Sequence, residues 1–117
     1  MQVHLVRCAE EAALVDLAVQ VAAREADRGD ARFEIAAAKI LADDAARVAT
    51  RAAHQAHGAI GMTQEYALHQ LSRRLWAWRA EYGDRIWPER LGRAVIDSGA
   101  DRLYRVIAEG SGSGIRV

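Results

Sequence analysis

The sequence predicts an all-α protein whose helices pack as an antiparallel bundle. Hydrophobic residues make up 51% of the 117 residues, alanine is very prominent, and there is one proline. Alanine has the highest helix propensity and proline the lowest, so this composition favours helix. Apolar residues recur at steps of three and four, and glycines follow the periodic segments. A chain of this length forms at most one domain around one modest core.

The first helix is expected over residues 3–28, with Gly29 as its stop. One apolar strip on it contains Leu14, Leu17 and Val21. A second strip contains Leu5, Ala9, Ala12, Val15 and Val19. Because the two strips nearly encircle the helix, we expect it to need packing partners on two sides.

The second helix is expected over residues 31–57, with Asp30 as its N-cap. Its apolar stripe is Ala38, Leu41, Ala45, Val48 and Ala52. Small side chains on this stripe let a neighbouring helix approach closely. The charged residues on its other faces are interpreted as a solvated surface, with an Asp43–Arg47 pair; they are Lys39, Asp43, Asp44, Arg47 and Arg51.

The third helix is expected over residues 64–82, capped by Thr63, and a fourth over residues 88–108, broken near Gly99. The apolar stripe of the third is Leu68, Leu71, Leu75, Trp78 and Tyr82. Trp76 and Trp78 point to different faces, so at least one is expected to meet a partner helix or subunit. Residues 1–108 are expected to form the bundle, and the Gly- and Ser-rich residues 109–117 to form a flexible tail.

Composition excludes several classes of function. Sixteen basic residues balance sixteen acidic ones, so no global field attracts nucleic acid or an anionic membrane. Cys8 is the single cysteine and cannot form an internal disulfide, and no signal peptide is recognised, so a cytoplasmic location is expected. His54 and His57 have H-x-x-H spacing but lack further ligands, so no metal site is predicted. No serine lies in a nucleophile elbow.

The most informative stretch is residues 55–66, which read Q-A-H-G-A-I-G-M-T-Q-E-Y. Gly58 and Gly61 allow positive φ or close approach of the backbone to a ligand. On the residues alone, a helix C-cap followed by a tight turn is slightly favoured over a ligand site. No strand precedes the glycines and no lysine follows them, so the stretch is neither a P-loop nor a dinucleotide fingerprint.

The pattern Q-x-H-G-x-x-G-x-T-x-E-Y resembles the acyl-CoA dehydrogenases, in which Q-x-H-G-G-x-G-x-T-x-E-Y closes a helix of the C-terminal bundle and touches FAD. The likeness continues through residues 37–42 and 71–73 and covers most of residues 1–108. It implies that Gln55 contacts the ADP half of FAD bound mainly by a neighbouring subunit, and that Gly58 permits backbone approach. His57 fits the family pattern, whereas Ala59 replaces the usual second glycine.

The resemblance also implies where a catalytic base would lie. In much of the family the third helix ends in Glu-Gly-Thr, and the matching residues here are Tyr82-Gly83-Asp84. A phenol, with its ordinary pKa of about 10, is a poor base for abstracting an α-proton near neutral pH. Glu81 is a weak candidate, because one helical step rotates it by roughly 100° from the base position.

These observations favour the C-terminal helical domain of an acyl-CoA dehydrogenase-like flavoprotein oxidoreductase of lipid metabolism. Its role would be an oligomerisation surface and part of an FAD site, in a homo-oligomer or a heteromeric subunit. Because the family's other domains and the first helix of its bundle are not recognised here, the chain alone is expected to be inactive. The alternative is a stand-alone helical interaction module without cofactor. A dimer or larger assembly is expected, with Trp76 or Trp78 near the contact.

Overall fold

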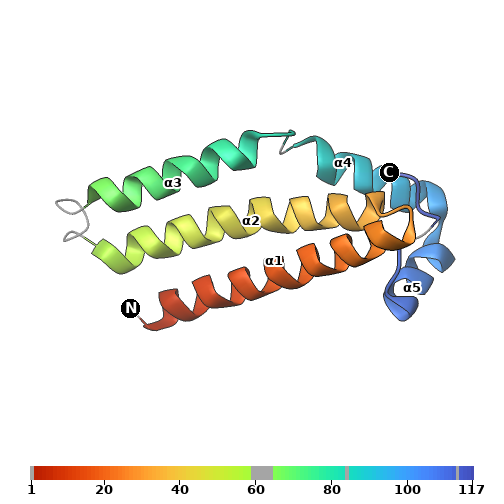
Figure 1. The fold of residues 1–117 in the computed structure, drawn as a ribbon, viewed down its shortest axis with the longest axis horizontal. Coiled ribbons are helices and arrows are strands. Elements are labelled where there is room, and N and C mark those ends of the chain that lie inside the picture. The colour runs from red at the N-terminus through yellow and green to blue at the C-terminus, as the bar shows by residue number, and fades with distance from the viewer. Residues whose placement is uncertain (1, 59–64, 84, 113) are drawn as a thin grey trace.

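The computed structural model describes residues 2–58, 65–83, 85–112 and 114–117, and within these it contains helices and no strand. The helices are α1 (Gln2–Arg28), α2 (Arg32–His57), α3 (Glu65–Ala80), α4 (Ile86–Ser98) and α5 (Ala100–Glu109) (Figure 1). The predicted all-α class is therefore confirmed.

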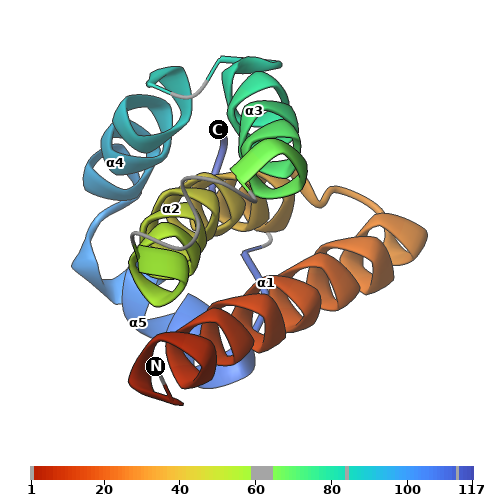
Figure 2. The same cartoon turned by 90° about the vertical axis from the view of Figure 1, so that its left-hand side faces the viewer.

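Helix α2 is the centre of the arrangement. It packs along α1 in an antiparallel pair and carries α3 and α4 on another side, while α5 packs against α4 (Figures 1 and 2). The molecule is elongated, with extents of 52 × 26 × 26 Å. Different faces of α2 therefore contact α1, α3 and α4, and the residues on each face have to suit that neighbour.

The predicted helix ends agree closely with the structure, with two informative differences. Gly29 ends α1, its N–H donating to the Glu25 carbonyl at 3.0 Å, and Gly99, at φ 83°, separates α4 from α5. The third helix ends at Ala80 rather than at residue 82, because Tyr82 has a left-handed φ of 64°. The fourth begins two residues early, at Ile86, with Pro88 still in its first turn.

Asp30 does not take the N-cap position of α2, which Ala31 occupies without a side-chain cap. Asp30 acts from one residue earlier, where its Oδ1 accepts the Arg32 backbone N–H at 3.2 Å. The same carboxylate accepts two hydrogen bonds from the Arg32 guanidinium, at 2.9 and 2.7 Å. These hydrogen bonds from Arg32 hold the pKa of the Asp30 carboxyl at about 2.

The core is built mainly from alanines. On α2 the predicted stripe is confirmed in part, because Ala38, Ala45 and Ala52 are buried while Leu41 and Val48 are half-buried. The other buried alanines are Ala22, Ala31, Ala36 and Ala94. A methyl group keeps helix axes near the short end of the usual separation of about 8–10 Å, so the packing depends on close approach of backbones.

The solvated-surface interpretation is wrong for two of the charged residues on α2. The side chains of Lys39 and Asp43 are only 20% and 12% exposed and pair at 2.6 Å. Lys39 also donates to the Arg79 carbonyl at 2.9 Å. The last carbonyls of α3 lack helical partners and carry partial negative charge, so they attract this ammonium. Arg47 pairs with Asp44 at 2.8 Å instead of with Asp43.

The predicted apolar stripe of α3 is also partly wrong. Leu71, Trp78 and Tyr82 are exposed, whereas Ser72 is buried, at 2% exposure. Its hydroxyl lies 2.9 Å from His54 Nε2 on α2. The face of α3 that carries Ser72 is therefore turned toward α2, where His54 satisfies the buried hydroxyl.

The C-terminal segment docks on the bundle in the structure. Ile115 is 2% exposed, and the Gly112 N–H donates to the carboxylate of Glu34. The Ser111 hydroxyl donates to Glu25 at 3.3 Å. The flexibility predicted for residues 109–117 stays a prediction. In the docked position Gly112 packs against Phe33.

Gly112→Ala is expected to release this segment, because an added Cβ would lie 2.2 Å from Phe33 Cδ1. The readout is the amide heteronuclear NOE of Ile115, high in the wild type and reduced to terminal values in the variant. Gly92→Ala is the control, since its Cβ would meet no atom within 4 Å. A low NOE at Ile115 in the wild type would refute the docked position.

Candidate functional site

The candidate cofactor residues lie at the C-terminal end of α2. Gln55 is exposed in the last turns, on the same face as Arg51 and Arg47, since residues four apart stack along a helix. Gly58 is the C-cap residue, with φ 50° and ψ −148°, and its N–H donates to the His54 carbonyl. The C-cap expected from the glycine is confirmed.

Gly58 leaves its α-carbon open on the side where other residues carry a side chain. A Cβ built there meets no atom within 4 Å. The backbone can therefore be approached closely by another molecule at this point. The positions of Ala59, Gly61 and Thr63, which complete the motif, lie outside the described residues.

His54 and His57, in the last turn of α2, have different hydrogen-bond partners. His57 Nδ1 lies 2.7 Å from the Ala53 carbonyl. Because a carbonyl only accepts, Nδ1 carries the hydrogen and Nε2 is left as the outer ring nitrogen. His54 instead holds Ser72 of α3. The described residues contain no group of three or more His, Cys, Asp or Glu side chains placed to hold a metal ion.

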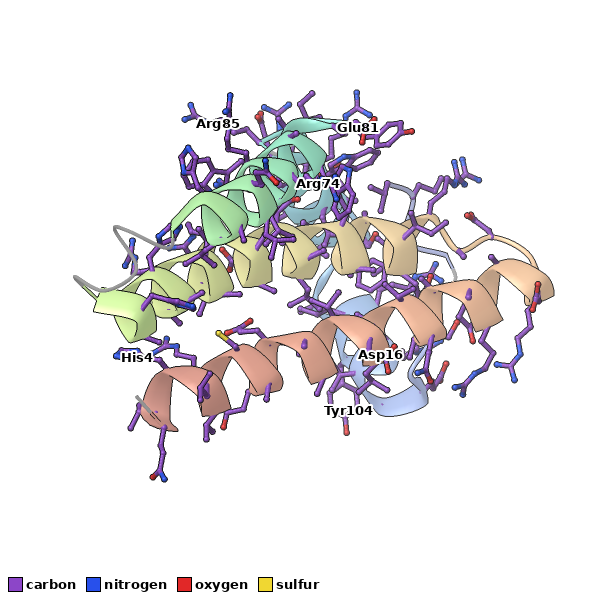
Figure 3. The ribbon with its side chains drawn as sticks, turned by 60° about the vertical axis from the view of Figure 1, so that its left-hand side comes forward. His4, Asp16, Arg74, Glu81, Arg85 and Tyr104 are labelled. Atoms are coloured by element: carbon purple, nitrogen blue, oxygen red, sulfur yellow. The ribbon has the colours of Figure 1, made fainter. Side chains whose placement is uncertain are left out.

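Gln55 borders a cavity of about 280 Å³ between the start of α1 and the end of α2. We call it the α1–α2 pocket; it is lined by Val3, His4, Arg7, Arg47, Val48, Arg51, Ala52 and Gln55. None of these described lining residues is acidic. Figure 3 shows His4 on the side of α1 that faces α2.

Sequence reasoning missed the contributions of His4 and Arg7 to this pocket. The spacing of Arg47, Arg51 and Gln55 was a usable signal, because it places three polar side chains on one helical face. Nothing local indicates that Arg7, which comes from a different helix, joins them. The α1–α2 pairing creates the cluster.

The candidate base position lies at the junction of α3 and α4. Tyr82 is 82% exposed, and its carbonyl accepts the Trp87 indole N–H at 2.8 Å. Glu81 is exposed beside it on the outer surface of this junction (Figure 3). Because α3 ends at Ala80, the helical rotation expected between Glu81 and Tyr82 does not apply to this backbone.

One chain does not bring the two candidate regions together. Lys39 of α2 contacts the Arg79 carbonyl, which places the α3–α4 junction beside the N-terminal half of α2. Gln55 lies sixteen residues further along the same helix. At 1.5 Å per residue the separation along α2 is about 24 Å. Any site that uses both regions therefore combines them across different chains or spans this distance.

The fold and the glycine-capped end of α2 define an all-α helical-bundle domain. A family model described as "Acyl-CoA dehydrogenase, C-terminal domain" matches residues 1–84. The chain therefore belongs to the acyl-CoA dehydrogenase family, as its C-terminal domain. No curated protein and no solved structure matches the chain.

Residues 85–117, which include α4, α5 and the docked segment, lie beyond the family match. The match covers α1, α2 and α3, and it includes every residue that lines the α1–α2 pocket. In the part of the chain that the structure describes, no helix has the length and apolar character needed to cross a bilayer.

Proposed function

We propose that this domain supplies part of an FAD site in an assembled acyl-CoA dehydrogenase-type oxidoreductase, at a junction between chains. The observation that carries the proposal is the position of Gln55, exposed at the edge of a cationic pocket and one turn before an open Gly58. The amide of Gln55 can donate a hydrogen bond to an anionic oxygen, and Gly58 lets a ligand approach the main chain.

The residues present fit the ADP half of FAD. Guanidinium groups pair well with phosphate oxygens, and the pocket presents Arg7, Arg47 and Arg51 without a lining carboxylate. FAD, when bound, accepts the hydride equivalent in dehydrogenation of an acyl-CoA thioester. This chain's residues position the distal, nucleotide end of the cofactor, and His57 keeps its inner ring nitrogen on the helix so that Nε2 faces outward.

The exposed apolar surfaces of α1 and α3 serve assembly in this function. On α1 the large apolar side chains left exposed are Val3, Leu5, Val6, Leu14, Leu17 and Val19. On α3, Leu71, Trp76 and Trp78 are exposed. Apolar surface of this extent is typical of protein–protein contacts, so these faces are proposed to meet neighbouring subunits, with Trp76 or Trp78 at the contact.

The candidate base for proton abstraction lies at the junction of α3 and α4, away from the pocket. Tyr82 occupies the position of the family's base, and Glu81, exposed next to it, is the one carboxylate proposed to substitute. Because this junction lies about 24 Å along α2 from Gln55, the nucleotide end of the cofactor and any base occupy separate regions of the assembly.

Reconstitution tests this function. We expect the purified 117-residue chain to be colourless, to sediment as a dimer or larger species, and to show no acyl-CoA-dependent dye reduction. Mixed with a chain that carries the family's N-terminal and middle domains, it should form a yellow complex with a flavin absorption band. A flavin band from the isolated chain, or a monomer at micromolar concentration, would contradict the proposal.

The runner-up function is a stand-alone helical interaction module. The exposed apolar faces of α1 and α3 favour it as much as they favour a subunit. The two functions separate in the reconstitution experiment, because a module would associate with its partner without any flavin uptake.

A further inference from the structure

We propose that a second cavity, between α1, the N-terminal half of α2 and α5, binds a small organic ammonium ion. Its volume is about 280 Å³, and we call it the Glu34 cavity. Aliphatic side chains of α1 and α2 form most of its wall, together with Phe33 and with Val106 of α5. Glu34 is the one polar side chain among the described lining residues, so the site combines a carboxylate with an apolar wall.

The carboxylate of Glu34 is buried and only half satisfied. Glu34 is 6% exposed; its Oε1 accepts the Gly112 N–H, whereas Oε2 has no hydrogen-bond partner among the described residues. Within the same part of the chain, Glu34 forms no ion pair. Because a buried carboxylate is costly without a paired charge, this site favours a positively charged ligand with hydrogen-bond donors.

A role in stabilising α2 alone does not explain this burial. Glu34 lies in the first turn of α2, where the positive end of the helix dipole favours an acid. That interaction needs no enclosure by apolar side chains and leaves Oε2 without a donor. The contact with Gly112 likewise uses only Oε1.

Neither water nor a metal ion fits the free oxygen well. A buried water typically makes about three hydrogen bonds, and the other described side chains of the cavity are apolar. A metal ion needs several ligands, and the described residues bring together no group of three or more His, Cys, Asp or Glu side chains. An ammonium on an apolar body suits both parts of the site, because its N–H groups can donate to the carboxylate while its carbon atoms contact the wall.

Phe33 and the size of the cavity narrow the class of ligand. Phe33 lines the same cavity as Glu34, and an aromatic ring attracts a cation that lies within about 6 Å of its centre. The volume of about 280 Å³ is close to the lower limit of ligand pockets, which are roughly 300–1,000 Å³. The expected ligand is therefore a compact monovalent ammonium with one apolar group.

This inference is independent of the proposed FAD site. Gln55 lies twenty-one residues beyond Glu34 on α2, which is about 32 Å along the helix axis. Helix α5 lies at the opposite end of the α1–α2 pair from Gln55 (Figures 1 and 2), and Val106 and Gly112 lie outside residues 1–84. The cavity opens at Leu14 and Leu17, so a subunit packed on α1 would close it over a bound ligand.

Titration of the labelled chain with benzylammonium and with benzyl alcohol, followed by amide chemical shifts, tests the assignment. The two probes are similar in size, and only the first is charged. Benzylammonium should shift amides around Glu34 and Val106 and bind about tenfold more tightly than the alcohol, because a hydrogen bond between charged groups is stronger than a neutral one. Absent shifts, or equal affinities for the two probes, would overturn the proposal.

Glu34→Gln removes the charge and keeps an oxygen that can accept the Gly112 N–H. It should weaken the binding of benzylammonium by about tenfold and leave that of benzyl alcohol unchanged. Glu89→Gln is the matched control, since it removes the same charge from an exposed position of α4 and should change neither affinity. Equal weakening of benzylammonium binding by both variants would indicate a general charge effect and contradict the site.

Leu17→Trp tests the cavity without changing Glu34. Leu17 is 58% exposed at the rim, so the fold can accept a larger side chain there, and the indole would reduce the free volume. Both probes should bind more weakly to this variant. Unchanged affinity for benzylammonium would show that the ligand binds elsewhere and would overturn the assignment.

Discussion

Ala45→Leu is expected to destabilise the domain by about 1–3 kcal/mol, because the added methylenes enter a closely packed seam. Ala45 is 7% exposed on α2, between Ala38 and Ala52 of the buried stripe. A leucine there has to push the neighbouring helix outward. That movement would also separate the methyl groups of Ala38 and Ala52 from the backbone of the neighbouring helix.

The measurement is thermal unfolding at one fixed protein concentration, since assembly also affects the melting temperature. For a domain of this size the expected decrease is roughly 4–12 °C. Ala23→Leu, at an exposed position of α1, is the control and should change little. Equal melting temperatures for wild type and Ala45→Leu would show that the stripe does not face a neighbouring helix.

The extent of the helices could be predicted because the signals are local. Alanine-rich periodic segments and the glycines at 29 and 99 are adjacent in sequence to the ends that they determine. The small-residue stripe of α2 was recognisable for the same reason. Tyr82 is an exception, since its left-handed backbone ends α3 early without a glycine.

The orientation of α3 could not be predicted from its own sequence. Apolar spacing favoured burial of Leu71 and Trp78, yet both are exposed, while Ser72 is buried and lies within hydrogen-bond distance of His54 of α2. Lys39 likewise bonds a carbonyl forty residues away. Contacts between helices decide which polar groups can be buried. The sequence of one helix does not show which side chains of the neighbouring helix it will contact.

The candidate site was predicted in part. The motif identified Gln55 and Gly58, and both are exposed at the end of α2 as a ligand contact requires. Arg47 and Arg51 are exposed, as the solvated-surface interpretation expects. Their grouping with Arg7 depends on the pairing of α1 with α2, which the sequence of α2 alone does not indicate. The roles of Gln55, His57, Gly58 and Ala59 toward FAD remain predictions, as does that of Glu81.

Flavin affinity of the reconstituted complex tests the proposed role of this domain most directly. Gln55→Ala should weaken FAD binding by one to two orders of magnitude, because a hydrogen bond to a charged group contributes about 1.5–3 kcal/mol. Gln20→Ala, an exposed substitution on α1, controls for loss of a surface amide and should not change affinity. FAD affinity that is equal in the wild-type and Gln55→Ala complexes would contradict a cofactor site at the end of α2.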